Sequence, residues 1–381
     1  MDLSRVLAGP YCTMLLADLG ADVVKLERPG GGDETRSWGP PFAGGEAAYY
    51  LSVNRSKRSC AVDLSDPDGR ALALELCAGA DVVVENFRLG GADRLGVGYD
   101  RVVERNPEVV YCSITGFGSD RTPPGRPAYD FVAQAETGLM SITGPPEGPA
   151  YKVGVALVDV LAGVHAAVGV LAALRGDGPR RLEVPLLDAG LAGLVNVAQN
   201  ALITGGDPER HGNAHPNIVP YQDFATASGQ LAVAAPNDGL FAAFCRAIGR
   251  PELAADPRFR TNPDRVEHRH ELIPELQSVL ATRSADEWVD TLDAAGVPVG
   301  KVRTVPEALG AAADSGRSAT VTVDHPAAGE LELVASPIWG ATAPADPPPI
   351  LGQHTAEVLR ELGKTESEIS ELSRRGAVQV A

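Results

Sequence analysis

The chain has 381 residues, of which 44% are hydrophobic, enough for two domains or one elaborate α/β domain. Its 50 acidic and 33 basic side chains give a formal net charge of −17, which argues against nucleic-acid binding because that function needs a basic face. The five cysteines show no paired spacing and the N-terminus shows no secretory signal, so we expect a reduced, cytoplasmic protein without a metal site.

The first half of the chain alternates helical and strand patterns. Residues 3–19 predict the end of a strand, a turn at Ala8-Gly9-Pro10 and a helix, and further apolar strands are predicted at 23–26, within 79–87 and at 109–118. Such alternation predicts an α/β fold with a parallel, doubly wound sheet, whose ligands bind at the carboxyl ends of the strands. The polar or aromatic residues expected at those ends are Glu27, Arg28, Glu85, Asn86 and Phe87.

The most apolar stretch, residues 153–174, contains one carboxylate, that of Asp159. An isolated buried carboxylate is costly unless it is paired, hydrogen-bonded or protonated, so Asp159 is a candidate functional residue. The simpler and compatible interpretation is that Asp159 caps a helix running to about residue 174. The run is long enough for a membrane span, but Asp159, His165 and the nearby glycines favour a buried helix.

In the second half of the chain, the stretch from about 205 to 310 differs in composition and predicts a smaller domain. A turn at 176–181, a strand at 182–187 and a helix to about 201 precede a Gly/Pro-rich linker at 205–220. Beyond it we expect a strand at 230–235, helices at 240–248, 269–282 and 285–295, a strand at 331–334, a connector at 343–349, and closing helices at 355–362 and 366–374.

Several nucleotide and nucleophile motifs are missing. The chain has no GxGxxG after its first strand, no GxxxxGK[ST] and no GxSxG, so neither a nicotinamide nor a nucleoside-triphosphate site is indicated. The first hundred residues nevertheless gather arginines and lysines that fit either a solvated surface or a phosphorylated ligand: Arg28, Arg36, Arg55, Lys57, Arg58, Arg88 and Arg94.

Ordered sequence blocks along nearly the whole chain carry a family resemblance. They are DLSRVLAGPYCTMLLADLGADVVKLERPGGGD at 2–33, NRSKRSCAVDL at 54–64, ADVVVENFRLGGADRLG at 80–96, YDFVAQAETGLM at 129–140, VGVALVDVLAGVHAAVGVLAAL at 153–174, GNAHPNIVPYQDF at 212–224 and PPILGQHTAEVLRELG at 348–363. Together these blocks resemble the class III CoA-transferases of the CaiB/BaiF type, the superfamily of formyl-CoA transferase and α-methylacyl-CoA racemase.

The resemblance implies a fold and an assembly. It implies a Rossmann-like large domain built from about 1–200 and 315–381, with a small α+β domain at 201–314 between them. It also implies a homodimer of interlocked rings. Members of the family usually have a longer segment before the first block, so the start is expected to be truncated or misassigned, or the first strand completed by other residues.

The family nucleophile falls on Asp159. By this resemblance, Asp159 attacks the donor acyl-CoA to form a mixed anhydride, and the CoA thiolate then gives an aspartyl-CoA thioester and a free acid. The acceptor carboxylate reverses the sequence. Asp130 is predicted as a second catalytic-site residue, either shaping the site directly or supporting it from behind.

The resemblance also implies the contacts to coenzyme A, which is substrate rather than cofactor. Residues expected to bind it are Val6, Leu7, Ala8, Arg28, Val62, Asn86, Phe87 and Arg94. Leu7 replaces a glutamine of some relatives, Ser65 replaces a lysine, and 220–229 lacks the glycine-rich lid of the formyl-CoA type. The first two departures put single contacts in doubt, and the missing lid argues against an oxalate-specific enzyme.

Two other functions remain open. A 2-methylacyl-CoA racemase shares the fold but would need a histidine before Asp130, where this chain has Tyr129, a poor base near neutral pH. A non-catalytic CoA-binding protein would retain CoA without exchanging any acid. Aromatic and sulfur side chains that would line an acyl pocket, or belong to the core, are Trp38, Phe42, Tyr49, Tyr50, Met140 and Tyr151.

Overall fold

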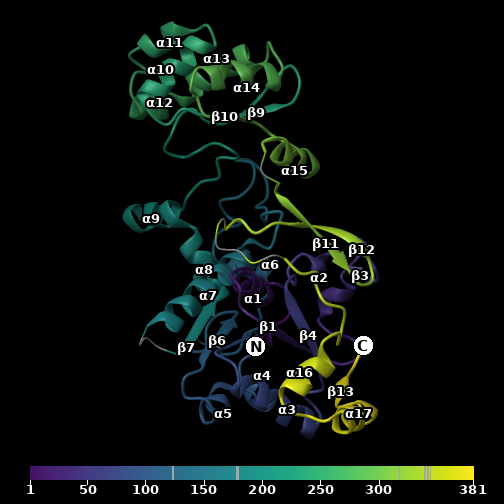
Figure 1. Cartoon of the computed structure of the whole chain (residues 1–381). Coiled ribbons are helices and arrows are strands. Elements are labelled where there is room, and N and C mark those ends of the chain that lie inside the picture. Colours follow the sequence, from purple (N-terminus) through teal and green to yellow (C-terminus); the bar gives the residue numbers. More distant parts are fainter. Residues whose placement is uncertain (122–123, 177–179, 317, 339, 341–342, 344) are drawn as a thin grey trace. The chain divides into compact units, whose positions relative to one another are not determined.

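The computed structural model describes residues 1–381 except 122–123, 177–179, 317, 339, 341–342 and 344. These residues form two compact units, unit 1 with residues 1–139, 152–206 and 316–381, and unit 2 with residues 140–151 and 207–315 (Figure 1). The segment 140–151, which the sequence placed in the first domain, groups with unit 2. Arg210 holds it there by donating hydrogen bonds to the carbonyls of Ser141, Pro145 and Gly148.

Unit 1 is built on a mostly parallel sheet. Its strands are β1 (Val23–Glu27), β4 (Lys57–Val62), β5 (Val82–Glu85), β6 (Val110–Thr115), β7 (Arg181–Pro185) and β13 (Val378–Gln379). They form the rows β13-β4-β1 and β5-β6-β7, and only β13 runs antiparallel to its neighbour. Asp2 makes parallel bridges to Lys25 of β1 and Val84 of β5, so residues 1–3 join the two rows into one sheet.

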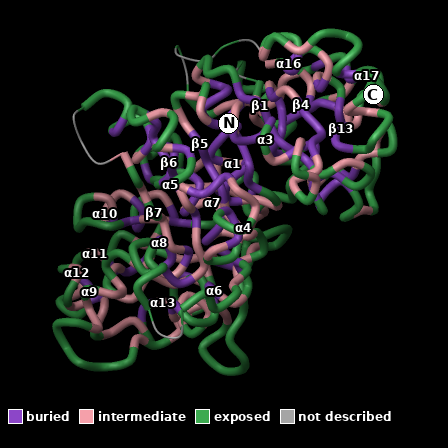
Figure 2. Tube along the Cα trace, turned by 90° about the horizontal axis from the view of Figure 1, so that it is seen from below, coloured by how far each residue is buried: buried purple, intermediate pink, exposed green. Residues whose placement is uncertain are grey.

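Alternation along these strands divides the core into two layers. Val83 and Tyr111 face a cluster with Leu26, whereas Val84 and Cys112 face the opposite cluster. The first layer is covered by helices α3 (Pro67–Ala78), α5 (Tyr99–Val103), α16 (Thr355–Glu361) and α17 (Glu366–Arg374). The second is covered by α1 (Ala8–Asp18), α6 (Asp130–Glu136), α7 (Leu157–Arg175) and α8 (Leu186–Gly193). Figure 2 shows the buried residues running along the strands and α1.

Helix α1 begins earlier than the sequence predicts. Ala8, Gly9 and Pro10 form its first turn, so the predicted turn at these residues is wrong, and the chain reverses instead at Val6 and Leu7. Proline is tolerated there because the amides of a first helical turn have no intrahelical partner. Helix α1 packs closely on α7: a Cβ added at Gly163 would lie 2.7 Å from the Ala8 carbonyl oxygen.

The helix predicted to run to residue 201 is broken. It consists of α8 and α9 (Val195–Thr204), which meet at 81°, and Val195 has a φ of 36°. Helix α9 buries none of its residues within unit 1, although Val195, Leu202 and Ile203 are apolar. An apolar helix without a buried face indicates an interaction surface.

Unit 2 has its own core. Strands β8 (Tyr221–Ala225), β9 (Gln230–Ala234) and β10 (Val299–Lys301) form an antiparallel sheet in the order β10-β9-β8. The helices of this unit are α10 (Asp238–Ala247), α11 (Pro251–Ala255), α12 (Asn262–Glu267), α13 (Arg269–Leu280), α14 (Ala285–Ala294) and α15 (Val305–Asp314). The predicted strand at 230–235 and helices at 240–248, 269–282 and 285–295 are confirmed within two residues at each end.

Shorter elements complete unit 1. They are the 3-10 helix η1 (Glu34–Ser37), the hairpins β2 (Phe42–Ala43) with β3 (Glu46–Ala47) and β11 (Thr320–His325) with β12 (Gly329–Val334), and the one-turn helices α2 (Ala48–Leu51) and α4 (Gly91–Arg94). The predicted turn at 176–181 and connector at 343–349 fall partly outside the described residues.

Candidate active site

Asp159 lies in the first turn of α7, as its third residue. The helix is preceded by Ala156, so Asp159 is not its cap, and the capping interpretation is wrong. A different carboxylate does that work: Asp130, at the start of α6, accepts a 2.8 Å hydrogen bond from the Val158 N–H. The Asp159 side chain is thereby left available for another role.

Gln134 ties Asp130 to the segment before α7. Its amide donates to Asp130 at 2.7 Å and to the Val155 carbonyl at 3.2 Å, while its carbonyl accepts from the Val153 N–H at 2.8 Å. Asp130 and Gln134 stand four residues apart on α6 and therefore share one face. This clamp fixes the backbone that presents Asp159.

The Asp159 carboxyl is buried, and its environment disfavours the ionised form. The residue is only 7% exposed, and burial, followed by the nearby charge of Asp130, raises its pKa to about 7. Tyr49 is close enough to interact electrostatically with Asp159. Burial, followed by the charge of Asp159, raises the pKa of the Tyr49 phenol to about 12. A buried carboxyl with a perturbed pKa in a cavity is a candidate functional group.

The loop facing Asp159 is strained. Val6 has a φ of 70°, a left-handed conformation that is unusual for a β-branched residue and is found at functional sites. Its N–H donates to the Asp33 carboxylate at 3.2 Å, and Asp33 also pairs with Lys25 at 3.0 Å. Asp33, itself paired with Lys25, therefore stabilises the strained backbone conformation of Val6.

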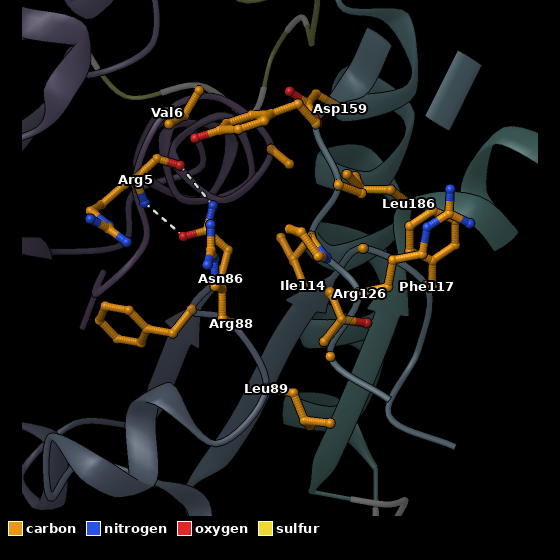
Figure 3. Close-up of a pocket in the computed structure, with 18 of the residues that line it drawn as sticks. Arg5, Val6, Asn86, Arg88, Leu89, Ile114, Phe117, Arg126, Asp159 and Leu186 are labelled. Carbon is orange, nitrogen blue, oxygen red and sulfur yellow. Dashed lines mark hydrogen bonds between the residues drawn. The ribbon is translucent and has the colours of Figure 1, made fainter. Parts of the chain in front are cut away.

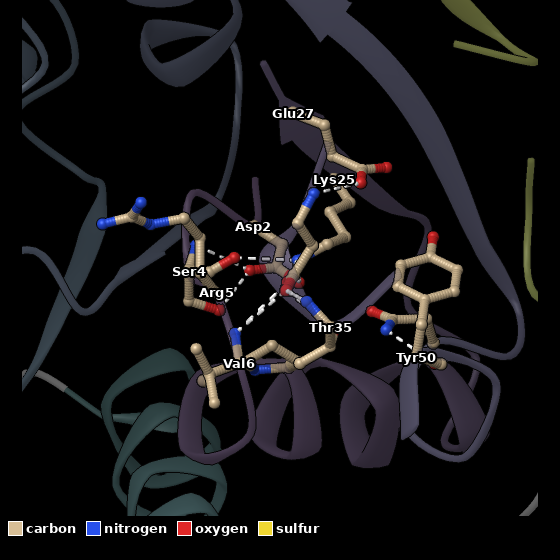
Figure 4. A network of polar contacts seen from close by, with 12 residues as sticks. Asp2, Ser4, Arg5, Val6, Lys25, Glu27, Thr35 and Tyr50 are labelled. Carbon is tan, nitrogen blue, oxygen red and sulfur yellow. Dashed lines mark hydrogen bonds and ion pairs between the residues drawn. The ribbon is translucent and has the colours of Figure 1, made fainter. Parts of the chain in front are cut away.

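That support is part of a buried ion network (Figure 4). The same alternation that directs Val24 and Leu26 to the apolar layer directs Lys25 and Glu27 to the other face of β1. Lys25 donates to the Ser4 carbonyl at 2.8 Å, and Lys57 pairs with Asp2 at 3.1 Å and donates to the Pro10 carbonyl at 2.8 Å. The network thus holds both ends of segment 4–10, which comprises the loop before α1 and the first turn of that helix.

Two cavities meet at this loop. One, of about 160 Å³, is lined by Asp159 together with Val6, Leu7, Ala8, Asn86 and Phe87 (Figure 3). The other, of about 340 Å³, is lined by Arg28, Val62, Ser65 and, again, Phe87. Seven of the eight residues predicted to bind CoA therefore line this pair of cavities. Arg94, at the end of α4, lines neither.

The sequence missed residues at the site. Arg5 and Glu34 line both cavities and pair with each other at 2.7 Å, and Arg126 lines the cavity of Asp159. Arg5 directly precedes Val6, one of the predicted CoA contacts, but nothing in the local sequence pattern distinguishes Arg5 itself. Among the aromatic residues predicted for the acyl pocket or the core, Tyr50 is fully buried and its hydroxyl accepts a hydrogen bond from Arg36. The ring of Tyr49 lies edge-on to that of Trp38, with 5.4 Å between the ring centroids.

Within the described part of the chain, no group of three or more His, Cys, Asp or Glu side chains is arranged to hold a metal ion. The five cysteines are free and buried.

The sequence profile of CoA-transferase family III matches residues 1–355. The chain belongs to this family. The mouse succinyl-CoA:glutarate CoA-transferase is 39% identical, with 100% of this chain and 89% of the mouse protein covered. The succinate–glutarate CoA-transferase of Agrobacterium fabrum is 40% identical over 95% of this chain and 94% of that protein.

A solved structure agrees with this assignment. A CaiB/BaiF family protein from Brucella suis has a TM-score of 0.83 and 38% identity, covering 94% of this chain and 97% of its own. The family III member described here is thus a CoA-transferase with a mixed α/β fold, and CoA is its substrate.

Proposed function

We propose that the chain transfers CoA from succinyl-CoA to a dicarboxylic acid such as glutarate, through covalent intermediates on Asp159. The substrates are those of the mouse and Agrobacterium fabrum relatives. The observation that carries the mechanism is the burial of an unpaired Asp159 carboxylate, with its pKa raised to about 7, in a cavity lined by the predicted CoA contacts.

The first half-reaction makes the enzyme thioester. An Asp159 oxygen attacks the thioester carbon of the donor. The C–S bond breaks and the CoA thiolate departs, so that a mixed anhydride of Asp159 and the donor acyl group remains on the enzyme. The thiolate attacks the Asp159 carbonyl of that anhydride, which releases the donor acid and leaves an aspartyl-CoA thioester. A poorly solvated carboxylate is a stronger nucleophile than a hydrated one, and exclusion of water protects the anhydride from hydrolysis.

The second half-reaction runs in reverse order with the new acid. The acceptor carboxylate attacks the Asp159 carbonyl and expels the thiolate, which then attacks the acceptor carbonyl and frees Asp159 with the new acyl-CoA. The Ala8 N–H, in the first turn of α1, is our proposed donor to the oxyanions. Ala8 lines the cavity of Asp159, and its amide lies where helical N–H groups have no intrahelical partner, at the positive end of the helix dipole.

Asp130 supports this chemistry without touching the substrate in our account. It holds the first turn of α7 through Val158, and its charge contributes to the raised pKa of Asp159. It is therefore a positioning residue.

We also propose a Rossmann-like large domain, an interlocked homodimer and a cytoplasmic location. The exposed apolar side chains of α9 support the dimer, since an interface would cover them. Light scattering of the purified chain should give twice the mass of one chain, and a monomer would contradict it.

The test of the function is a transfer assay. The chain is incubated with succinyl-CoA and a panel of acids, and new acyl-CoA is measured by chromatography. Glutaryl-CoA should form with wild-type protein and not with Asp159→Asn. Failure to exchange any acid, with α-deuterium uptake into a 2-methylacyl-CoA, would replace the transferase by a racemase.

A further inference from the structure

Arg5 and Glu34 stand at the border between the two cavities. Three residues line both of them: Arg5, Glu34 and Phe87. A CoA thioester that reaches Asp159 in one cavity and Arg28 and Val62 in the other must pass this border. CoA carries a pyrophosphate between its nucleoside and its pantetheine arm, so an anionic group has to cross it.

The backbone of Arg5 is held by two hydrogen bonds to Asn86, whereas its side chain is about half exposed to solvent. The Arg5 N–H donates to Asn86 Oδ1 at 2.8 Å, and Asn86 Nδ2 donates back to the Arg5 carbonyl at 2.7 Å (Figure 3). The guanidinium lies 5.6 Å from the ring centroid of Phe87. A clamped backbone that carries a long solvated cation can change the partner of that cation without moving the loop.

The present partner of Arg5 is replaceable. Its Nη1 lies 2.7 Å from Glu34 Oε1, and the two side chains are 47% and 42% exposed, which makes this a weak, solvent-screened pair. A phosphate offers a guanidinium two parallel charge-assisted hydrogen bonds, a stronger arrangement than this single contact. Glu34 also places a negative charge on the path of an anionic ligand.

We propose that Arg5 exchanges Glu34 for a phosphate oxygen of CoA when substrate binds, and that Glu34 is the internal competitor that weakens this binding. The inference rests on CoA being the substrate but not on the covalent steps at Asp159. It assigns opposite roles to the two members of one ion pair, because Arg5 attracts the phosphate and Glu34 repels it while occupying Arg5. The competition limits the affinity for CoA and so favours release of the product.

The test compares Arg5→Gln and Glu34→Gln. CoA affinity is measured by calorimetry. The kcat/KM is measured with succinyl-CoA and with succinyl-pantetheine, which lacks the pyrophosphate, each with a dicarboxylic and with a monocarboxylic acceptor. Arg5→Gln should weaken CoA binding roughly tenfold and lower kcat/KM only for succinyl-CoA. Glu34→Gln should instead tighten CoA binding. Arg374→Gln, which breaks an exposed pair with Glu371 outside both cavities, is the matched control and should change neither.

Three results would overturn the proposal. Equal weakening of CoA binding by both variants would make the pair a structural contact only. Equal loss with succinyl-pantetheine would place Arg5 on the acyl or pantetheine part. A loss seen only with dicarboxylic acceptors would assign Arg5 to the second carboxylate of the acid. Because calorimetry needs no turnover, these outcomes are distinct from a failure of the proposed transfer reaction.

Discussion

Two groups of buried carboxylates lie on either side of segment 4–10, and their pKa values are shifted in opposite directions. Behind the loop, Asp2 and Asp33 are paired with Lys25 and Lys57, and these cations outweigh the effect of burial and hold both carboxyl pKa values below their usual range. In front of it, Asp159 has no cationic partner among the residues that the structure describes, and burial, followed by the charge of Asp130, raises its pKa to about 7. Burial is common to both regions, so the partners decide which carboxylate is inert and which is reactive.

The largest effect should follow from replacing the unpaired group. Asp159→Asn keeps the size of the side chain but removes the nucleophile, and transfer activity should fall by roughly 10⁴-fold or more. The measurement is the rate of CoA transfer from succinyl-CoA. Residual activity within tenfold of wild type would show that Asp159 is not the attacking group.

Breaking the paired region should affect stability. Lys25→Ala leaves Asp33 and Asp2 buried without their shared cation, and we expect a loss of about 3–5 kcal/mol in the free energy of unfolding. Urea denaturation followed by circular dichroism measures it. The control Arg374→Ala removes an exposed ion pair and should cost less than about 1 kcal/mol.

Replacing Asp159, unlike replacing Lys25, should increase the stability of the folded protein at alkaline pH. Because its folded pKa of about 7 exceeds its ordinary value of 3.8, the contribution of the protonated form is fully present below pH 3.8 and is lost as the pH rises through 7. Asp159→Asn should therefore be more stable than wild type at pH 8, by up to roughly 4 kcal/mol, and nearly equal to it at pH 4. Denaturation at both pH values measures the difference; a loss of stability at pH 8 would contradict the account.

A smaller change should come from Asp130. Asp130→Asn keeps an oxygen that can accept from Val158 but removes the charge that contributes to the raised pKa of Asp159. The ascending limb of the kcat/KM profile should move to lower pH by up to about one unit. Gln134→Ala loosens the same clamp without removing a charge, so its profile should keep the wild-type midpoint.

The smallest effect concerns the strained loop. Val6→Gly relieves the left-handed conformation at φ 70°, and the strain relieved should exceed the entropy cost of glycine by about 1 kcal/mol. Thermal unfolding measures the gain. Leu7→Gly, at a residue with φ of −132°, should instead destabilise the protein.

Much of this arrangement could be predicted from the sequence. Apolar runs located β1, β5 and β6, and a carboxylate inside an apolar stretch singled out Asp159. Strand β4 was not predicted, because the buried polar residues Lys57 and Ser59, which join the ion network, break its apolar pattern. The border pair Arg5 and Glu34 lies 29 residues apart in sequence, and only the fold brings the two side chains together.

The central claim is that the unpaired carboxylate of Asp159 becomes covalently linked to substrate. Its most direct test is to incubate the chain with succinyl-CoA, add hydroxylamine, and map the modified peptides by mass spectrometry. Hydroxylamine converts an aspartyl anhydride or thioester into a hydroxamate on the same residue. We predict a hydroxamate on Asp159 and none on Asp2, Asp33 or Asp130. Modification of another carboxylate, or transfer without any adduct, would contradict the account.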